Sequence, residues 1–148
     1  MKKYEINSAE YDDVEDICAT QIAAIEQLSV DDYTREEIST WTGYITLPHA
    51  LNILQHEDTD VFVARDNETM VMGFVTIKND QITDIYVDPD HIERGIGSAL
   101  LRRAEWHIRK NGHRTIRLLS TLNSVNFYKN HGYHAVANQE YVLNDDVA

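Results

Sequence analysis

The sequence predicts a single α/β (α+β) domain over residues 1–148, built on a mixed, mostly antiparallel sheet of six to seven strands with a parallel βαβ core and flanking helices. The length of 148 residues and a hydrophobic content of 43% are typical of one globular domain with its own core. Short β-branched runs separated by turn residues indicate antiparallel hairpins. Residues 95–110 carry an apolar stripe at helical spacing between two such runs, and this strand–helix–strand order makes its two strands parallel.

The first half of the chain is predicted to supply a short strand and two helices. Residues 4–6 form the strand, and a helix follows from Ser8, its expected N-cap, to Leu28. The expected buried stripe of this helix consists of Val14, Ile17, Cys18, Ile22 and Ile25. Thr34 begins a second helix in the cap-then-acid pattern Thr-Arg-Glu-Glu, and residues 48–54 add a helical turn.

The second half is predicted to be mostly strand. Its strands are expected at residues 60–64, 70–78, 82–87, 114–120, 133–136 and 140–143. Turns at 66–69 and 79–80 join the first three. The long helix ends near Gly112, and a shorter helix covers residues 124–131.

Composition argues against several classes of protein. Cys18 is the only cysteine, so no internal disulfide can form and a cytoplasmic location is expected. Its position on an apolar stripe favours a packed thiol over a nucleophile. No apolar run approaches the roughly 20 residues that span a membrane. His131 and His134 are separated by a helix stop, and no cysteine or acid completes a set with them, so no metal site is expected.

The net charge of −12 is unevenly distributed. Residues 1–60 hold 14 acidic side chains against 3 basic ones, whereas residues 91–117 hold 7 basic against 2 acidic ones. Nucleic-acid binding requires a broad basic surface, so this balance argues against it. The local basic excess suits a polyanionic small molecule, although the same arginines could simply cover the solvent face of a helix.

A glycine-containing loop lies between the strand 82–87 and the long helix. The pair Asp88-Pro89 ends the strand, and Gly95-Ile96-Gly97 opens the helix. The first N–H groups of a helix have no partner within it, and glycine removes the Cβ that would hold an oxyanion away. The loop is therefore either a phosphate cradle or an ordinary glycine turn. It is not a dinucleotide fingerprint or a P-loop, because Leu100 replaces the third glycine and no Gly-Lys-Ser/Thr follows.

Two motifs resemble those of the GNAT N-acetyltransferase superfamily. The first is Tyr-Val-Asp-Pro at 86–89 followed by Gly-Ile-Gly-Ser-Ala-Leu-Leu at 95–101, although Ile92 stands where the family carries Gln or Arg. The second is the run 123–133, which resembles the family pattern Asn-x-x-x-Phe-Tyr-x-x-x-Gly-Phe/Tyr. The resemblance, which covers roughly residues 3–143, implies the GNAT fold. It also implies transfer of an acetyl group from acetyl-CoA, as cosubstrate, directly to an amine.

The resemblance also implies a set of cofactor-binding residues. In the family, acetyl-CoA lies where two parallel strands separate, and its pantetheine pairs with strand backbone. The residues carried over are Ile85, Val87, Ile92, Glu93, Arg94, Gly95, Ile96, Gly97, Ser98, Asn123 and Tyr128. Asn123 could instead cap the following helix. Arg94 or His91 could replace the side-chain contact that Ile92 lacks, although His91 is interpreted as a surface loop residue. Tyr128 is the expected catalytic residue, since a phenol can donate to a leaving thiolate; the alternative is a packed aromatic side chain.

The general base is the least defined part of the prediction. Family members often carry Glu or His at the positions of Gln81 or Thr83, and strand alternation would point Asp84 to the opposite face. We therefore expect a water relay, or an acid from the 26–41 region: Glu26, Asp31 or Asp32. The acidic first helices, with their aromatic residues, favour a cationic small-molecule or peptide amine as acceptor.

Two functional hypotheses follow. One is an acyl-CoA-dependent N-acetyltransferase, and the other is a CoA-binding regulatory module of the same fold without turnover. The absent strand base and Ile92 favour the module, whereas Tyr128 and Asn123 favour the enzyme. A homodimer is common in the family and is expected as one possible state. No nucleic-acid or membrane partner is expected.

Overall fold

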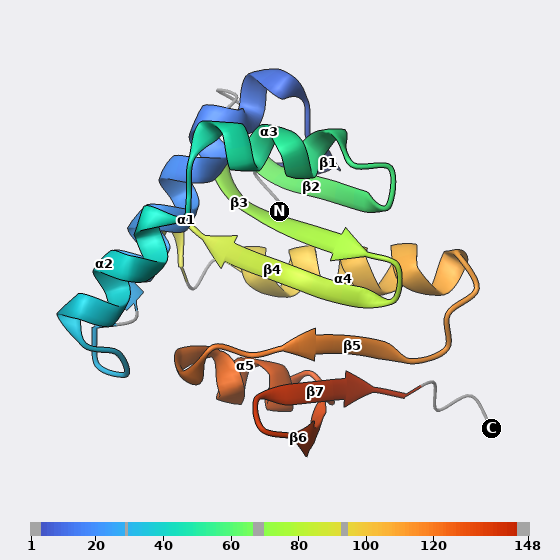
Figure 1. The fold of residues 1–148 in the computed structure, drawn as a ribbon. Coiled ribbons are helices and arrows are strands. Elements are labelled where there is room, and N and C mark those ends of the chain that lie inside the picture. Colours follow the sequence, from blue (N-terminus) through green and yellow to red (C-terminus); the bar gives the residue numbers. More distant parts are fainter. Residues whose placement is uncertain (1–3, 29, 67–69, 93–94, 145–148) are drawn as a thin grey trace.

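The computed structural model describes residues 4–28, 30–66, 70–92 and 95–144, and its centre is a seven-stranded sheet with the order β1-β2-β3-β4-β5-β7-β6 (Figure 1). The strands are β1 (Tyr4–Ser8), β2 (Thr59–Asp66), β3 (Val71–Lys78), β4 (Gln81–Val87), β5 (Ile116–Leu119), β6 (His134–Ala137) and β7 (Glu140–Leu143). Every neighbouring pair is antiparallel except β4 and β5. The predicted mixed sheet with a parallel βαβ core is confirmed.

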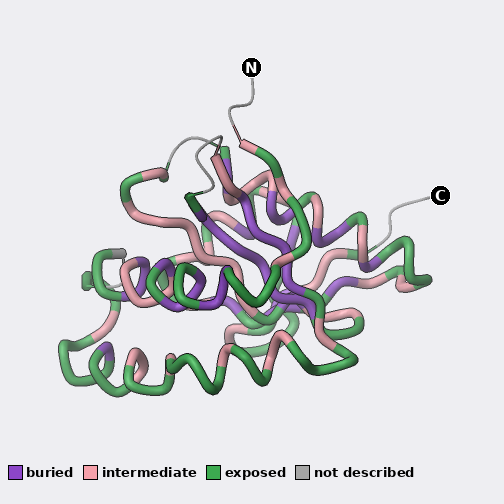
Figure 2. The backbone as a smooth tube through the Cα atoms, turned by 90° about the horizontal axis from the view of Figure 1, so that it is seen from above, coloured by how far each residue is buried: buried purple, intermediate pink, exposed green. Residues whose placement is uncertain are grey.

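Helices cover both faces of this sheet. They are α1 (Val14–Leu28), α2 (Arg35–Gly43), α3 (Leu47–Gln55), α4 (Ile96–Lys110) and α5 (Val125–Asn130), with 3₁₀ turns η1 (Tyr11–Asp13), η2 (Pro89–His91) and η3 (Leu122–Ser124). α4 packs against one face, while α1 and α3 pack against the other (Figure 1). Buried residues concentrate along the central strands (Figure 2). Each face therefore has its own apolar cluster.

The start of the first helix differs from the prediction. Ser8 ends β1, and the α-helix begins only at Val14, after the 3₁₀ turn η1. Glu10 acts as the N-cap, because its side chain and that of Asp13 bond reciprocally to each other's backbone N–H groups. Asp13 is also held by a two-bond ion pair with Arg65 of β2, at 2.6 and 2.7 Å. These contacts stabilise the 3₁₀ turn η1, so α1 begins only after it.

The remaining elements agree with the prediction apart from their ends. Thr34 caps α2 in a capping box with Glu37, as its sequence indicates. The helical turn expected at 48–54 is a nine-residue helix, capped by Thr46. The turn predicted at 66–69 includes residues 67–69, which lie outside the described residues. Leu47 and Leu51 of α3 are exposed, so this helix contacts the protein along one side.

A β-bulge in β4 changes which side chains face α1. Ile82 pairs with Ile77, but the next pair is Asp84 with Thr76, so Thr83 is an extra residue. The Thr83 hydroxyl donates to the Thr76 carbonyl at 3.2 Å. Ile82 belongs to the α4-side cluster, and beyond the bulge Ile85 and Val87 continue that side. Asp84 and Tyr86 therefore face α1, where simple alternation would place Asp84 beside Ile82.

β4 and β5 pair only at their beginnings. The register joins Gln81 to Arg117 and Ile82 to Leu118, and no further pairs follow among the described residues. The Asp80 carboxylate, in the turn before β4, forms two hydrogen bonds with the Arg117 guanidinium, both at 2.9 Å. The strands are thus fastened at one end and open toward Val87.

Gly73 in β3 lets α4 approach the sheet closely. A Cβ at this position would lie 2.9 Å from the Tyr86 carbonyl oxygen, 3.1 Å from Leu100 Cδ1 and 3.3 Å from Ile96 Cγ2. The backbone oxygen cannot move without shifting β4. Gly73→Ala is therefore expected to lower the free energy of unfolding by about 1–3 kcal/mol, measured by chemical denaturation.

Gly43→Ala is the matched control for this prediction. Gly43 ends α2, and a Cβ there would meet no atom within 4 Å. Since alanine favours the helix by about 0.5–1 kcal/mol, the control should be at least as stable as the wild type. A Gly73→Ala protein as stable as the wild type would contradict the close approach of α4.

Candidate active site

A cleft of about 480 Å³ opens where the end of β4, the N-terminus of α4 and α5 meet. The sequence-predicted residues that line it are Ile85, Val87, Ile92, Gly95, Ile96, Gly97, Ser98, Asn123 and Tyr128. Glu93 and Arg94, also predicted, lie outside the described residues. The fold thus brings nine of the predicted residues to one cleft, from β4, α4, η3, α5 and the loop before α4.

The open end of β4 supplies unpaired backbone to this cleft. The Asp88 N–H donates to the Met72 carbonyl of β3 at 2.8 Å. Backbone groups of successive residues in an antiparallel strand point alternately to its two sides, so those of Val87 and Ile85 point away from β3. Because β5 has already separated from β4, these groups face the opening. A ligand with amide groups can pair with them as an added strand would.

The first turn of α4 supplies free N–H groups. Gly95 is the N-cap residue, with φ of 78°, and as a glycine it has no side chain that could accept a hydrogen bond from the helix N–H groups. Left-handed backbone of this kind is costly for residues with a Cβ, which explains the glycine. The first intrahelical bond visible there is from Ala99 N–H to the Gly95 carbonyl, at 3.0 Å. The N–H groups of residues 96–98 therefore remain available to an anion.

Two further observations describe the space and the polar groups that this cleft offers to a ligand. A Cβ at Gly97 would lie 3.4 Å from the Phe127 ring, so any side chain there would occupy the cradle. His91, interpreted from sequence as a surface residue, lines the cleft instead. Its Nδ1 is buried without a hydrogen bond, and the nearest acid, Asp88, lies 3.7 Å away. Ile92 is 44% exposed and offers the cradle no polar side chain.

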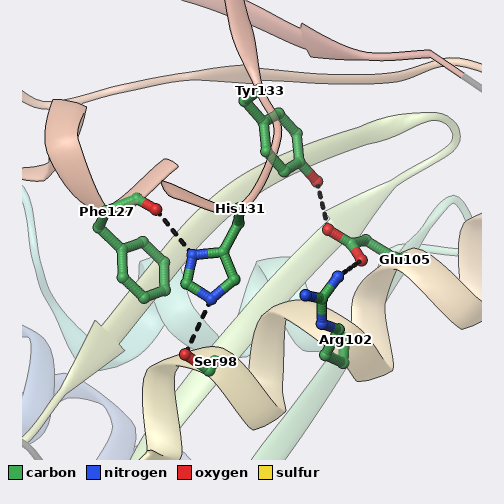
Figure 3. A network of polar contacts seen from close by, with 6 residues as sticks. All are labelled: Ser98, Arg102, Glu105, Phe127, His131 and Tyr133. Carbon is green, nitrogen blue, oxygen red and sulfur yellow. Dashed lines mark hydrogen bonds and ion pairs between the residues drawn. The ribbon is translucent and has the colours of Figure 1, made fainter. Parts of the chain in front are cut away.

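Ser98 is tied to α5 rather than free to bind a ligand through its hydroxyl (Figure 3). Its Oγ lies 2.9 Å from His131 Nε2, and His131 Nδ1 lies 2.7 Å from the Phe127 carbonyl. A carbonyl only accepts, so Nδ1 carries the proton and donates. In the neutral ring Nε2 then accepts from the Ser98 hydroxyl. The contribution of Ser98 to the cleft is therefore its backbone N–H.

A second polar contact in the same view holds the end of α5 against α4 (Figure 3). The Tyr133 hydroxyl donates to Glu105 Oε2 at 3.0 Å, and Arg102 Nη1 donates to Glu105 Oε1 at 3.1 Å. Glu105 and Tyr133 are both buried. Because Tyr133 follows α5 directly in the chain, this contact stabilises the packing of the C-terminal end of α5 against α4.

Tyr128 is almost fully buried at the cleft, at 6% exposure. Its ring packs edge-on against Phe127 at 5.2 Å and Tyr133 at 5.8 Å. Burial, and then the nearby charge of Asp84, raise the pKa of the Tyr128 phenol above its ordinary value. The phenol is therefore protonated throughout the physiological range and acts as a hydrogen-bond donor.

Asn123 also lines the cleft, and the alternative that it caps the following helix is wrong. The N-cap of α5 is Ser124, and the N-cap of the preceding turn η3 is Thr121. The Asn123 amide is thus available to a ligand in the cleft.

Asp84 is the functional candidate that sequence reasoning missed. The bulge at Thr83 places it on the α1 side of β4, next to a second cavity of about 180 Å³. Burial raises the pKa of Asp84 to about 7. The charge of Asp84 in turn raises the pKa of Tyr128, so the two groups share one electrostatic environment. A carboxyl that titrates near neutral pH can accept a proton in the working range of an enzyme.

The acids predicted as alternative bases do not reach this site. Glu26, Asp31 and Asp32 are exposed and line neither the cleft nor the second cavity. Among the residues that the structure describes, no group of three or more His, Cys, Asp or Glu side chains could hold a metal ion. Within the same described ranges, no helix is long and apolar enough to cross a membrane.

Comparison with known proteins agrees with this geometry. The profile of the Acetyltransferase (GNAT) domain family matches residues 29–145. An uncharacterized N-acetyltransferase of Methanocaldococcus jannaschii is 26% identical in an alignment of length 147 that covers 90% of this chain. The chain spans 62% of that relative's length.

Two solved structures share the fold. The GCN5-related N-acetyltransferase from Rhodopseudomonas palustris has a TM-score of 0.89 at 22% identity, covering 97% of each chain. The PaiA N-acetyltransferase from Thermoplasma acidophilum, solved in complex with coenzyme A, has a TM-score of 0.83 at 22% identity, covering 95% of this chain and 97% of that one. Because the family profile matches most of its length, this chain belongs to the GNAT acetyltransferase family.

Proposed function

We propose that this protein transfers an acetyl group from acetyl-CoA directly to an amine, either a cationic small molecule or a peptide amine. The observation that carries the proposal is the position of one partly buried carboxyl, Asp84, and one buried phenol, Tyr128, near the opening between β4 and β5. A solved structure of the same fold contains coenzyme A, which supports the choice of cosubstrate.

The cofactor cradle consists mostly of main chain. The N–H groups of residues 96–98 at the start of α4 would hold the diphosphate, with Gly95 and Gly97 leaving it room. Ile85 and Val87 would pair with the pantetheine amides, and the Val87 N–H would polarise the thioester carbonyl. Asn123 would contact the pantetheine from η3, the turn before α5. Glu93, Arg94 and Ile92 belong to the same loop and stay predictions as ligands.

Asp84 and Tyr128 would divide the proton chemistry. Bound acetyl-CoA supplies an activated acyl carbon and a thiol leaving group. Asp84 would first take a proton from the bound ammonium group and release it to solvent, which leaves a neutral amine. As the amine nitrogen then forms its bond to that carbon, the carbon–sulfur bond breaks, and Asp84 takes the second proton that the nitrogen loses. Tyr128 donates a hydrogen bond to the departing sulfur, which then takes a proton from solvent.

The raised pKa of Asp84 matters for this transfer. Transfer of a proton from an alkylammonium group, with a pKa of about 10.4, to an ordinary aspartate is unfavourable, because the two pKa values differ by roughly 6.5 units. Against a carboxyl with a pKa of about 7 the difference is only about 3.4 units. The gain is roughly 4 kcal/mol, which is larger than a single added hydrogen bond supplies. With Asp84 as the base, the alternative of a CoA-binding module without turnover would lose its main support, which was the absence of a base on the strand.

Thiol release from acetyl-CoA in the presence of a panel of amines tests the proposal. The Gly97→Val variant is expected to raise the KM for acetyl-CoA about tenfold, because its side chain would project into the cradle toward Phe127. Ala99→Val places the same side chain in the same helical turn, and Ala99 does not line the cleft, so this control should leave that KM unchanged.

Coenzyme A that binds the wild type and Gly97→Val equally, or thiol release with no amine at all, would contradict the proposal. The extent of the domain over 1–148, the cytoplasmic location and a possible homodimer stay predictions.

A further inference from the structure

The second cavity, called here the Asp84 cavity, lies between the helices and the sheet on the α1 side. Its volume is about 180 Å³. Ile17 of α1, Trp41 of α2 and Ala50 of α3 form its walls, and Phe74 of β3 and Asp84 of β4 form its floor. Tyr44 also lines it and is 72% exposed, so the mouth of the cavity lies at the α2–α3 connection.

The Asp84 cavity adjoins the acetyl-CoA cleft. On α1, Gln21 lines the cavity and Ala24 lines the cleft, one helical turn apart. On the sheet, Phe74 lines the cavity and Tyr86 lines the cleft, and these two rings pack 5.8 Å apart. Asp84 precedes Ile85 in β4, so its carboxyl lies on the side of β4 opposite the side chains of Ile85 and Val87. The charge of Asp84 nevertheless acts on Tyr128, which lines the cleft, so a molecule that binds at Asp84 lies close to the cleft.

The lining is mostly apolar and aromatic, and its polar members are the neutral side chains of Gln21, Thr46 and Thr76, together with His49 and Asp84. Among the described residues that line the cavity, Asp84 is the only carboxylic acid. A polyamine or an aminoglycoside would bring several ammonium groups, and all but one would lie without a carboxylate partner in an apolar site. Burial of each unpaired charge costs several kcal/mol. A molecule with a single ammonium group avoids this cost.

The size of the cavity limits the rest of the molecule. An apolar cavity of about 150 Å³ is enough to hold benzene. A space of 180 Å³ therefore takes one ring-sized group and a short connecting chain. Trp41 and Tyr44 add aromatic faces, which attract both flat apolar groups and cations.

We propose that the Asp84 cavity binds the acceptor, and that the acceptor is a primary amine joined by a short chain to one ring-sized apolar group. This assignment rests on the proposed acetyl transfer and narrows its acceptor from amines in general to arylalkylamine-like molecules. The ammonium group lies at Asp84 and the ring lies between Trp41 and Phe74. Polyamines, aminoglycosides and peptide amines are poor substrates.

Kinetics with 2-phenylethylamine, propylamine and spermidine test this assignment. The kcat/KM for 2-phenylethylamine should exceed that for spermidine at least about tenfold. Ala50→Leu adds an isopropyl group to the cavity wall and should raise the KM for 2-phenylethylamine at least about tenfold, while the KM values for propylamine and acetyl-CoA change little. If this variant does not fold, Ile45→Phe narrows the cavity from the loop before α3.

Asn52→Leu is the matched control. Asn52 lies on the exposed side of the same helix, so the added apolar group stays outside the cavity and every KM should remain as in the wild type. The assignment is overturned if spermidine is the better substrate, or if Ala50→Leu affects 2-phenylethylamine and propylamine equally while turnover persists.

A separate measurement keeps the two proposals distinguishable. If no amine releases thiol, acetyl transfer is wrong, and isothermal titration with 2-phenylethylamine then judges the cavity alone. Binding by the wild type that Ala50→Leu weakens about tenfold supports the assignment. Absence of binding, or equal binding by both proteins, overturns it.

Discussion

The Asp84→Asn variant is expected to lower kcat about 100-fold with the best amine, the size of effect typical of removing a general base. Asparagine keeps the shape of the side chain but cannot accept the proton. In the wild type, kcat should rise with pH through a midpoint near 7, because burial raises the pKa of Asp84 to about 7 and only the carboxylate is active. The rise of kcat with pH, which is one limb of the pH–rate profile, should disappear in the variant.

Asp31→Asn and Asp32→Asn are the controls, since both acids were base candidates from the sequence and both are exposed. Their pH–rate profiles should match the wild type. If kcat of Asp84→Asn still rises with pH through a midpoint near 7, the general base is a group other than Asp84.

The same substitution should change the pH dependence of stability in a defined direction. The folded pKa of Asp84 lies above the ordinary value of 3.8, so the folded protein binds its proton more tightly than the unfolded chain. The stability due to this group is present below about pH 4 and is lost as pH rises to about 7, by up to roughly 4 kcal/mol. Relative to the wild type, Asp84→Asn should be more stable at pH 8 than at pH 4 in urea denaturation.

The second large effect is expected for Tyr128→Phe. The variant should lower kcat about 10- to 100-fold, because a hydrogen bond to a charged group contributes about 1.5–3 kcal/mol. The KM for acetyl-CoA should change little, since the phenol hydrogen-bonds to the sulfur as charge develops on it. Burial raises the pKa of this phenol, so its ionisation should add no limb to the profile, and the limb near pH 7 should persist in the variant.

Tyr133→Phe separates this role from packing. It also removes a buried hydroxyl near the end of α5, but that hydroxyl donates to Glu105 and lies outside the cleft. The control should lose about 1–3 kcal/mol of stability and keep its kcat. Equal turnover by Tyr128→Phe and the wild type at every pH would show that the assigned role is wrong.

Local sequence patterns were sufficient for most of the fold. β4, the glycine loop, α4 and β5 follow from β-branched runs, a left-handed glycine and a helical stripe, all of which act within a few residues. The start of α1 was missed because Asp13 has a partner 52 positions away, Arg65, which no local pattern reveals. The cleft residues came from motifs, which specify backbone shape as well as side chains.

Asp84 was missed because strict alternation ignores the bulge. Without it, Asp84 would oppose Val75 in the α4-side core, where an acid has no partner. The spacing of the apolar residues contained the missing signal. Ile82, Ile85 and Val87 share one side of β4, and a three-residue step followed by a two-residue step is typical of an extra residue in a strand.

The short pairing between β4 and β5 has a mechanical consequence. Within the sheet, β5, β7 and β6 join the other strands through two register positions and the ion pair between Asp80 and Arg117, so few strand-to-strand contacts hold the two parts together there. A thioester that pairs with β4 and contacts α5 would add contacts between the part of the sheet formed by β1–β4 and the part formed by β5, β7 and β6. The stability of the folded protein would then rise with the concentration of that ligand, because a ligand that binds only the folded chain stabilises it by mass action.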